Sequence, residues 1–190
     1  MNQIKKKLYE EIKKQGLSID LDVFDYGVAI LKQYFICLFF SFVIGSYFKC
    51  IFEMILTIVF WSGIRRYIGG FHFENSTLCL FFTVLIIICI SKISRFLSVI
   101  LVFDFIFSVL ALIIIMKFGC IDHKNKPLSV EEKIYYKGRA IKRVYVYIIL
   151  ELVFRLISFN SISNIILLVL QLSSINLLIS TLVNKEKIIL

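Results

Sequence analysis

The sequence predicts an all-α, polytopic integral membrane protein with about six transmembrane helices and an N-terminal amphipathic helix at the membrane surface. Hydrophobic residues make up 59% of the 190 residues, the mean hydropathy is +0.90, and the chain has one proline. A soluble domain of this size would need a larger polar shell, so lipid is the expected solvent. The polar first 26 residues do not resemble a cleavable signal peptide, and we expect them to stay on the mature protein.

The N-terminal segment 1–27 is predicted to be a basic cytoplasmic element. Between residues 4 and 15, apolar side chains recur at helical spacing among lysines, and Gly16 offers a stop. The apolar positions are Ile4, Leu8 and Ile12. A helix with this pattern lies on the membrane surface rather than across the bilayer.

Residues 28–190 are predicted to form a single transmembrane domain. A helix rises about 1.5 Å per residue and the hydrocarbon core is about 30 Å thick, so a span needs about 20 residues. The second and third apolar runs are shorter than this. Three alternatives are open for them: the helices extend into flanking polar sequence, they tilt, or they cross only part of the bilayer. The apolar runs lie at about 28–48, 51–64, 78–94, 96–116, 143–159 and 162–183.

The basic residues predict the orientation of these spans. With the N-terminus inside the cell, most of the 22 Lys and Arg residues fall in cytoplasmic segments, and Lys49, Lys92 and Arg95 fall outside. This asymmetry places both termini and the loops 65–77 and 117–142 on the cytoplasmic side of a bacterial cell membrane. The net charge of +9 fits topology and anionic lipid, or an acidic partner. Nucleic acid is not expected, because the charges lie beside the bilayer without a binding module.

The segment 65–79 joins the second and third apolar runs and contains both a histidine and a cysteine. A cysteine nucleophile reacts as its thiolate, which a nearby imidazole or a helix N-terminus favours. His72 and Cys79 are therefore the candidate catalytic pair. The alternative is an imidazole at the interface and a packed thiol.

Helix geometry restricts how such a pair can meet. Seven residues of straight helix would separate the two side chains by about 10.5 Å along the axis, so the chain has to bend back. Gly69 and Gly70 permit the bend, and Ser76 or Thr77 is expected to cap the following helix. The group that orients the imidazole stays open among Glu74, Asn75, Ser76 and Asp122.

No metal or cofactor is predicted. The five cysteines have no CxxC spacing, and an odd number argues against a disulfide framework or a zinc site. The aspartates at 20, 22 and 25 resemble the start of a calcium loop, but the glycine and glutamate that the loop requires are missing. A second pair, Cys120 and His123, lacks the glycine-rich surround of the first.

Two segments together resemble a known family. The run from Arg65 to Cys79, with the two glycines and then His72, is similar to the signature of the accessory gene regulator B family of quorum-sensing peptidases. The loop from Cys120 to Leu128 resembles that family's cytoplasmic loop of Asp, Lys, Asn, Lys and Pro. Cys120-Ile121 departs from the small residue and proline that many members have there. Length and span pattern also fit, so the resemblance covers nearly the whole chain.

The resemblance implies a membrane cysteine endopeptidase without a cofactor. Cys79, with His72 as base, would cut the acidic C-terminal tail from a small precursor peptide with an amphipathic N-terminal part, and the thioester would close to a thiolactone or lactone ring. The family is usually homodimeric, and membrane lipids are a further expected partner. We take the neighbouring basic residues as candidates for binding the tail, although a role as topology anchors is an equal alternative. They are Arg65, Arg66, Lys124, Lys126, Arg139, Lys142 and Arg143.

Ionisable residues within the spans are expected to be structural. Glu151 and Arg155 are four residues apart and can neutralise each other on one helix. Asp104 then needs Lys32, Arg155 or another subunit as its partner. Two other classes of function remain: a small transporter or export component, and a noncatalytic membrane scaffold. The absence of an internal repeat argues against a transporter.

Overall fold

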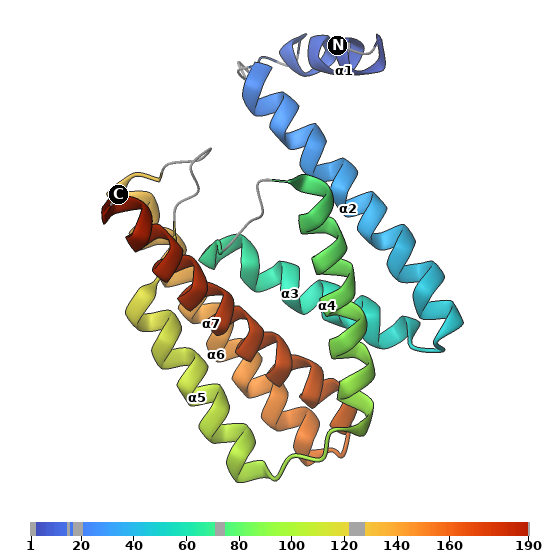
Figure 1. Cartoon of the computed structure of the whole chain (residues 1–190), viewed down its shortest axis with the longest axis vertical. Helices are drawn as coiled ribbons and strands as arrows, with labels where there is room; N and C mark the ends of the chain where they lie inside the picture. The colour runs from blue at the N-terminus through green and yellow to red at the C-terminus, as the bar shows by residue number, and fades with distance from the viewer. Residues whose placement is uncertain (1–2, 15, 17–20, 71–74, 122–127, 190) are drawn as a thin grey trace. The chain divides into compact units, whose positions relative to one another are not determined.

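A computed structural model describes residues 3–14, 16, 21–70, 75–121 and 128–189 (Figure 1). All regular structure in these ranges is α-helical, which confirms the predicted fold class. The helices are α1 (Gln3–Lys14), α2 (Leu21–Tyr47), α3 (Ile51–Ile68), α4 (Ser76–Phe96), α5 (Leu101–Phe118), α6 (Val130–Leu156) and α7 (Asn160–Ile189). They match the predicted surface helix followed by six apolar segments.

The chain divides into two compact units, Met1–Phe40 and Ser41–Leu190. In the first unit α1 ends at Lys14, and Gly16 follows with φ 82° and donates its N–H to the Lys13 carbonyl at 3.1 Å. This confirms the predicted glycine stop. Helix α2 begins at Leu21, so it passes without a break through the predicted boundary at residues 27 and 28. The division of the chain at that boundary stays a prediction.

Helices α3 and α4 are longer than the apolar runs that predicted them. With 18 and 21 residues, they extend about 27 Å and about 32 Å. Both helices therefore extend into flanking polar sequence, as one of the three alternatives predicted, and tilting or partial crossing of the bilayer stays a prediction. In the part of the chain that the structure describes, four segments are long and apolar enough to span a bilayer: Gly27–Tyr47, Thr77–Phe96, Leu101–Phe118 and Asn160–Val183.

Helices α3 and α6 carry more charged residues than these four segments, and ion pairs with neighbouring helices neutralise some of them. Arg95 of α4 forms an ion pair with Glu53 of α3 at 2.8 Å. Arg155 of α6 pairs with the buried Asp104 of α5 at 2.5 Å. The predicted pairing of Glu151 with Arg155 is wrong, because the guanidinium instead reaches across to α5, where it neutralises a buried carboxylate. That α3 and α6 span the membrane stays a prediction.

The core of the second unit lies where α7 packs against α3, α5 and α6. Helices α3 and α6 approach closely at Gly63. The approach leaves no room for a side chain there, since an added Cβ would overlap the Tyr147 hydroxyl. That hydroxyl donates to the Phe60 carbonyl at 2.9 Å. Such close approach at small residues is typical of helices packed in membranes. The fully buried side chains of α7 include Ile165, Ile166, Val169, Leu170 and Leu177.

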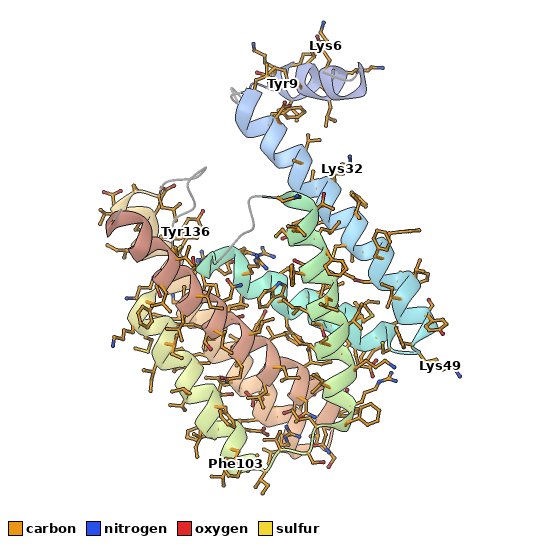
Figure 2. The ribbon with its side chains drawn as sticks, viewed as in Figure 1. Lys6, Tyr9, Lys32, Lys49, Phe103 and Tyr136 are labelled. Carbon is orange, nitrogen blue, oxygen red and sulfur yellow. The ribbon has the colours of Figure 1, made fainter. Side chains whose placement is uncertain are left out.

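Helices α4 to α7 alternate in direction within this unit (Figure 1). Phe103, near the start of α5, and Tyr136, in the first part of α6, lie at opposite ends of it (Figure 2). As a result, the C-terminal ends of α3 and α5, the N-terminal ends of α4 and α6, and the C-terminal part of α7 share one end of the bundle (Figure 1). Cys79, at the start of α4, and Ile121, just after α5, come from the two segments that carry the family resemblance, and both lie at that end.

Candidate functional site

Cys79 lies in the first turn of α4, and a side-chain cap defines how that helix begins. The Asn75 side-chain oxygen accepts from the Thr77 N–H at 2.9 Å, and the Cys79 N–H donates to the Asn75 carbonyl at 3.1 Å. The cap is therefore Asn75, one residue before the predicted Ser76, and asparagine is as good a helix cap as serine. Cys79 is partly exposed and is not in a disulfide.

The Gly69-Gly70 turn ends α3, and it has a well-defined support. Gly69 has φ 69° and its N–H donates to the Arg65 carbonyl at 3.0 Å. A Cβ added at Gly69 would lie 2.6 Å from the Ile121 carbonyl oxygen, and the Ile121 N–H donates to the Ile68 carbonyl at 3.1 Å. Glycine is thus required both by the backbone conformation and by the close approach of the segment that follows α5.

Gly70 lies against a different helix. Its φ is 138°, and an added Cβ would overlap the side-chain oxygen of Asn176 in α7. Neither Ile121 nor Asn176 was predicted as a neighbour of this turn. An amide late in an apolar helix was a weak signal for Asn176, whereas nothing in the local sequence marks Ile121.

Two of the predicted basic residues meet around one aromatic ring. The guanidinium carbons of Arg66 and Arg143 lie 5.9 Å and 5.7 Å from the centre of the Tyr67 ring, so α3 and α6 both contribute cations there. The Tyr136 ring is 6.5 Å from that of Tyr67. We call Arg66, Tyr67, Tyr136 and Arg143 the arginine–tyrosine cluster. Such cation–π contacts hold both guanidinium groups at the end of the bundle that also carries Cys79.

The remaining basic candidates are placed differently. Arg65 lies over Trp61, one turn earlier in α3, at 5.2 Å, and Arg139 lies over Tyr135 of its own helix at the same distance. Lys142 is exposed. We therefore do not count these three side chains in the arginine–tyrosine cluster.

Several predicted residues lie outside the described ranges. They are His72, Glu74, Asp122, His123, Lys124 and Lys126. The backbone of Ser76 is described as the first residue of α4, but its side chain is not. The geometry of the His72–Cys79 pair and the group that orients the imidazole therefore stay predictions.

The fold and the site define a class: an all-α polytopic membrane protein with a partly exposed cysteine, not in a disulfide, in the first turn of one of its apolar helices. A family model described as Accessory gene regulator B matches residues 1–177, and the chain belongs to this family. Membership gives it a role in the processing of quorum-sensing peptides.

Two relatives are similar over most of the chain. A protein of Clostridium perfringens (strain SM101 / Type A), named "Putative AgrB-like protein", is 29% identical over 165 residues, which cover 81% of this chain and 77% of the relative. "Putative AgrB-like protein 2" of Clostridium perfringens (strain 13 / Type A) is 28% identical over 148 residues, with coverages of 74% and 69%. No solved structure matches the chain.

Proposed function

We propose that this protein is a membrane cysteine endopeptidase that cleaves and cyclises a small quorum-sensing precursor, with Cys79 as nucleophile and His72 as base. The observation that carries the proposal is the position of Cys79, partly exposed and in the capped first turn of α4. Side chains of a helix tilt towards its N-terminus, so a thiol there lies beside the backbone N–H groups of the first turn. Backbone N–H groups at the start of a helix favour the negative charge of a tetrahedral intermediate formed there.

The proposed reaction has two acyl transfers. First, His72 takes the proton from the Cys79 thiol, and the thiolate attacks the scissile carbonyl. The peptide C–N bond breaks, the amine of the leaving tail receives the proton, and the N-terminal part remains as a thioester on the enzyme. Second, a thiol or hydroxyl within the same peptide attacks this thioester, which closes the ring and releases the Cys79 thiol. No oxidant or cofactor is needed.

The second transfer explains why such a site belongs at a membrane surface. Exchange of one thioester for another is nearly balanced in free energy, so hydrolysis of the acyl-enzyme is the competing loss. Holding the internal nucleophile close to the thioester can supply several kcal/mol, about 7 or more in well-oriented systems. An apolar surround lowers the access of water. An amphipathic precursor on the bilayer would reach the site from lipid.

The charge distribution supports a cytoplasmic location for this end of the bundle. Basic residues gather where α3 and α5 end and where α6 begins, and cytoplasmic segments are enriched in lysine and arginine. Those in the described segments are Arg65, Arg66, Lys117, Lys133, Lys137, Arg139, Lys142 and Arg143. We propose that the catalytic pair faces the cytoplasm, where an unprocessed precursor would be found.

The arginine–tyrosine cluster is our candidate for binding the acidic tail of the precursor. Two guanidinium groups beside one ring offer bidentate donors to carboxylates, and their aromatic contacts limit their conformational freedom. Arg143→Gln should raise KM for an acidic-tailed precursor roughly tenfold with little change in kcat, as loss of about 1.4 kcal/mol of uniform binding predicts. The control is Lys117→Gln, an exposed cation outside the cluster. Equal KM changes in both variants would contradict this assignment.

The proposal is tested with the full chain in lipid vesicles and a synthetic precursor that has an amphipathic segment, an internal cysteine and an acidic tail. Products are identified by peptide mass. We expect Cys79→Ala and His72→Ala to lose cleavage and Cys89→Ala, which changes an exposed thiol of the same helix, to keep it. Wild-type cleavage by either of the first two variants would refute the dyad. Transport of uncut peptide would instead favour an exporter.

A further inference from the structure

We propose that Asp104 and Glu151, together with the Ser108 hydroxyl, form a buried site for one small monovalent cation, either a proton or an alkali-metal ion. The three side chains come from the facing helices α5 and α6. The site uses neither Cys79 nor the arginine–tyrosine cluster, so it goes beyond the proposed peptidase activity. Ionisable side chains inside membrane bundles often bind or conduct ions, and Glu151 has no part in the proposed chemistry.

The two acids lie on consecutive turns of the contact between α5 and α6. Asp104 precedes Ser108 by four residues on α5, and Glu151 precedes Arg155 by four residues on α6. Arg155 pairs with Asp104. One turn further along, the Ser108 hydroxyl donates to Glu151 Oε2 at 2.5 Å. Both contacts connect the same two helices, so the carboxyl groups are neighbours whose charges act on each other.

Both carboxyl groups are buried, and each has one oxygen without a hydrogen-bond partner. The exposed fraction is 0% for Asp104 and 1% for Glu151. Among the described residues, nothing donates a hydrogen bond to Asp104 Oδ1 or to Glu151 Oε1. Most buried polar atoms in proteins are hydrogen-bonded, because burying one without a partner costs free energy. Two acceptor oxygens of this kind on neighbouring turns point to an electropositive ligand.

The charges of this region do not balance. One guanidinium, that of Arg155, faces two buried carboxyl groups, and it donates to Asp104 and to the neutral amides of Asn160 and Asn164 in α7. In the part of the chain that the structure describes, no ion pair joins it to Glu151. A buried carboxylate without a counter-ion carries a large desolvation penalty. One further positive charge would make the region neutral.

The available ligands suit a small monovalent cation. Protein sites for zinc or calcium have three or more protein ligands, and no group of three or more His, Cys, Asp or Glu side chains gathers within the described ranges. Two carboxyl groups and one hydroxyl offer oxygen ligands only. A single added charge also completes the balance, whereas a divalent ion would exceed it. A proton taken from water would neutralise Glu151 directly, and an alkali-metal ion would do so as a counter-ion.

The experiment uses the full chain in mixed micelles without any precursor. Infrared spectra identify a protonated carboxyl group, because its C=O absorption lies apart from that of carboxylates. Thermal unfolding at mildly alkaline pH is compared in sodium, potassium and choline chloride, since choline is too bulky for a buried site. We expect the wild type to show a protonated-carboxyl band, or to gain about 3 °C or more in Tm when sodium or potassium replaces choline.

Three variants assign the signal to the site. Glu151→Gln keeps the shape of the side chain without its charge, and it should abolish whichever signal the wild type gives. Ser108→Ala keeps both carboxyl groups, and it should shift the band or reduce the gain in Tm by about half or more. It also serves as the test if Glu151→Gln does not fold. Glu53→Gln is the matched control, because Glu53 is already paired with Arg95, and it should leave the signal unchanged.

The outcomes distinguish the two cations and decide the proposal. A protonated-carboxyl band that Glu151→Gln removes identifies the ligand as a proton. A gain in Tm that depends on Glu151, without the band, identifies an alkali-metal ion. A wild type with neither signal, or a signal that persists unchanged in Glu151→Gln, would overturn the site. These measurements do not involve Cys79, so they stand or fall independently of the peptidase proposal.

Discussion

Arg155 of α6 donates its Nε–H to the Oδ2 atom of Asp104 in α5 at 2.5 Å, and Asp104 is fully buried. The same guanidinium donates to Asn164 of α7 at 2.6 Å, and the Asn164 amide donates to the Ser94 and Leu97 carbonyls at the end of α4. One cation therefore connects four helices. This network lies at the end of the bundle opposite to Cys79, so it can stabilise the fold without taking part in the proposed chemistry.

Removing this cation should destabilise the protein strongly. Arg155→Met leaves the Asp104 carboxylate buried without its counter-ion, for which we expect a loss of about 3–5 kcal/mol in the free energy of unfolding, measured in mixed micelles. Arg95→Gln is the matched control, because its ion pair with Glu53 is partly exposed, and it should cost about 1 kcal/mol or less. The double variant Arg155→Met with Asp104→Leu should recover a large part of the loss. Equal effects of Arg155→Met and Arg95→Gln would contradict this account.

The contact between α3 and α6 offers a test by compensation. Gly63→Ala would force a methyl group against the Tyr147 hydroxyl and break its hydrogen bond to Phe60, at a cost of roughly 1–3 kcal/mol. Tyr147→Phe removes the hydroxyl and makes room. In thermal unfolding, the double variant should therefore be more stable than Gly63→Ala alone. If the two changes simply add, the helices do not meet at this point.

The cap of α4 can be tested separately from the catalytic residues. Asn75→Ala removes the acceptor of the Thr77 N–H and should cost about 1 kcal/mol, whereas Asn75→Asp should keep the cap. Hydrogen exchange of the amides in the first turn of α4 is the readout, and it should quicken in the alanine variant. Unchanged exchange would mean that another group caps the helix. If the cap also positions Cys79, the alanine variant will cleave precursor more slowly than the aspartate variant.

The sequence predicted the helices better than their contacts. Hydrophobic runs and basic loops were sufficient to predict the number and order of the helices. A membrane span requires a long apolar segment, and cytoplasmic loops are enriched in lysine and arginine. Helical spacing led to the prediction that Arg155 pairs with Glu151, and only the packing of α5 on α6 shows that its partner is Asp104. The glycine pair Gly69-Gly70 likewise predicted a bend. Its contacts with Ile121 and Asn176 could not be predicted, because those residues come from distant segments of the chain.

At the candidate site, local sequence patterns predicted which residues belong to the site but not which of them contact one another. They identified the Asn75-Ser76-Thr77 run as the start of a helix, but several of its residues can cap, and the side-chain geometry of α4 selects Asn75. Charge marked a set of seven candidate residues for tail binding, and the structure brings two of them, Arg66 and Arg143, together around Tyr67. Meeting points of this kind depend on how two helices pack, which composition and spacing do not specify.

The central claim, that Cys79 forms an acyl-enzyme, is tested most directly by the intact mass of the protein during turnover. A precursor whose internal cysteine is replaced by alanine cannot close a ring, so its thioester should accumulate. We predict that the wild-type chain and Cys89→Ala gain the mass of the N-terminal part of the precursor, that hydroxylamine removes it, and that Cys79→Ala gains nothing. A labile adduct of the same mass on Cys79→Ala, or cleavage by wild type without any adduct, would contradict the account.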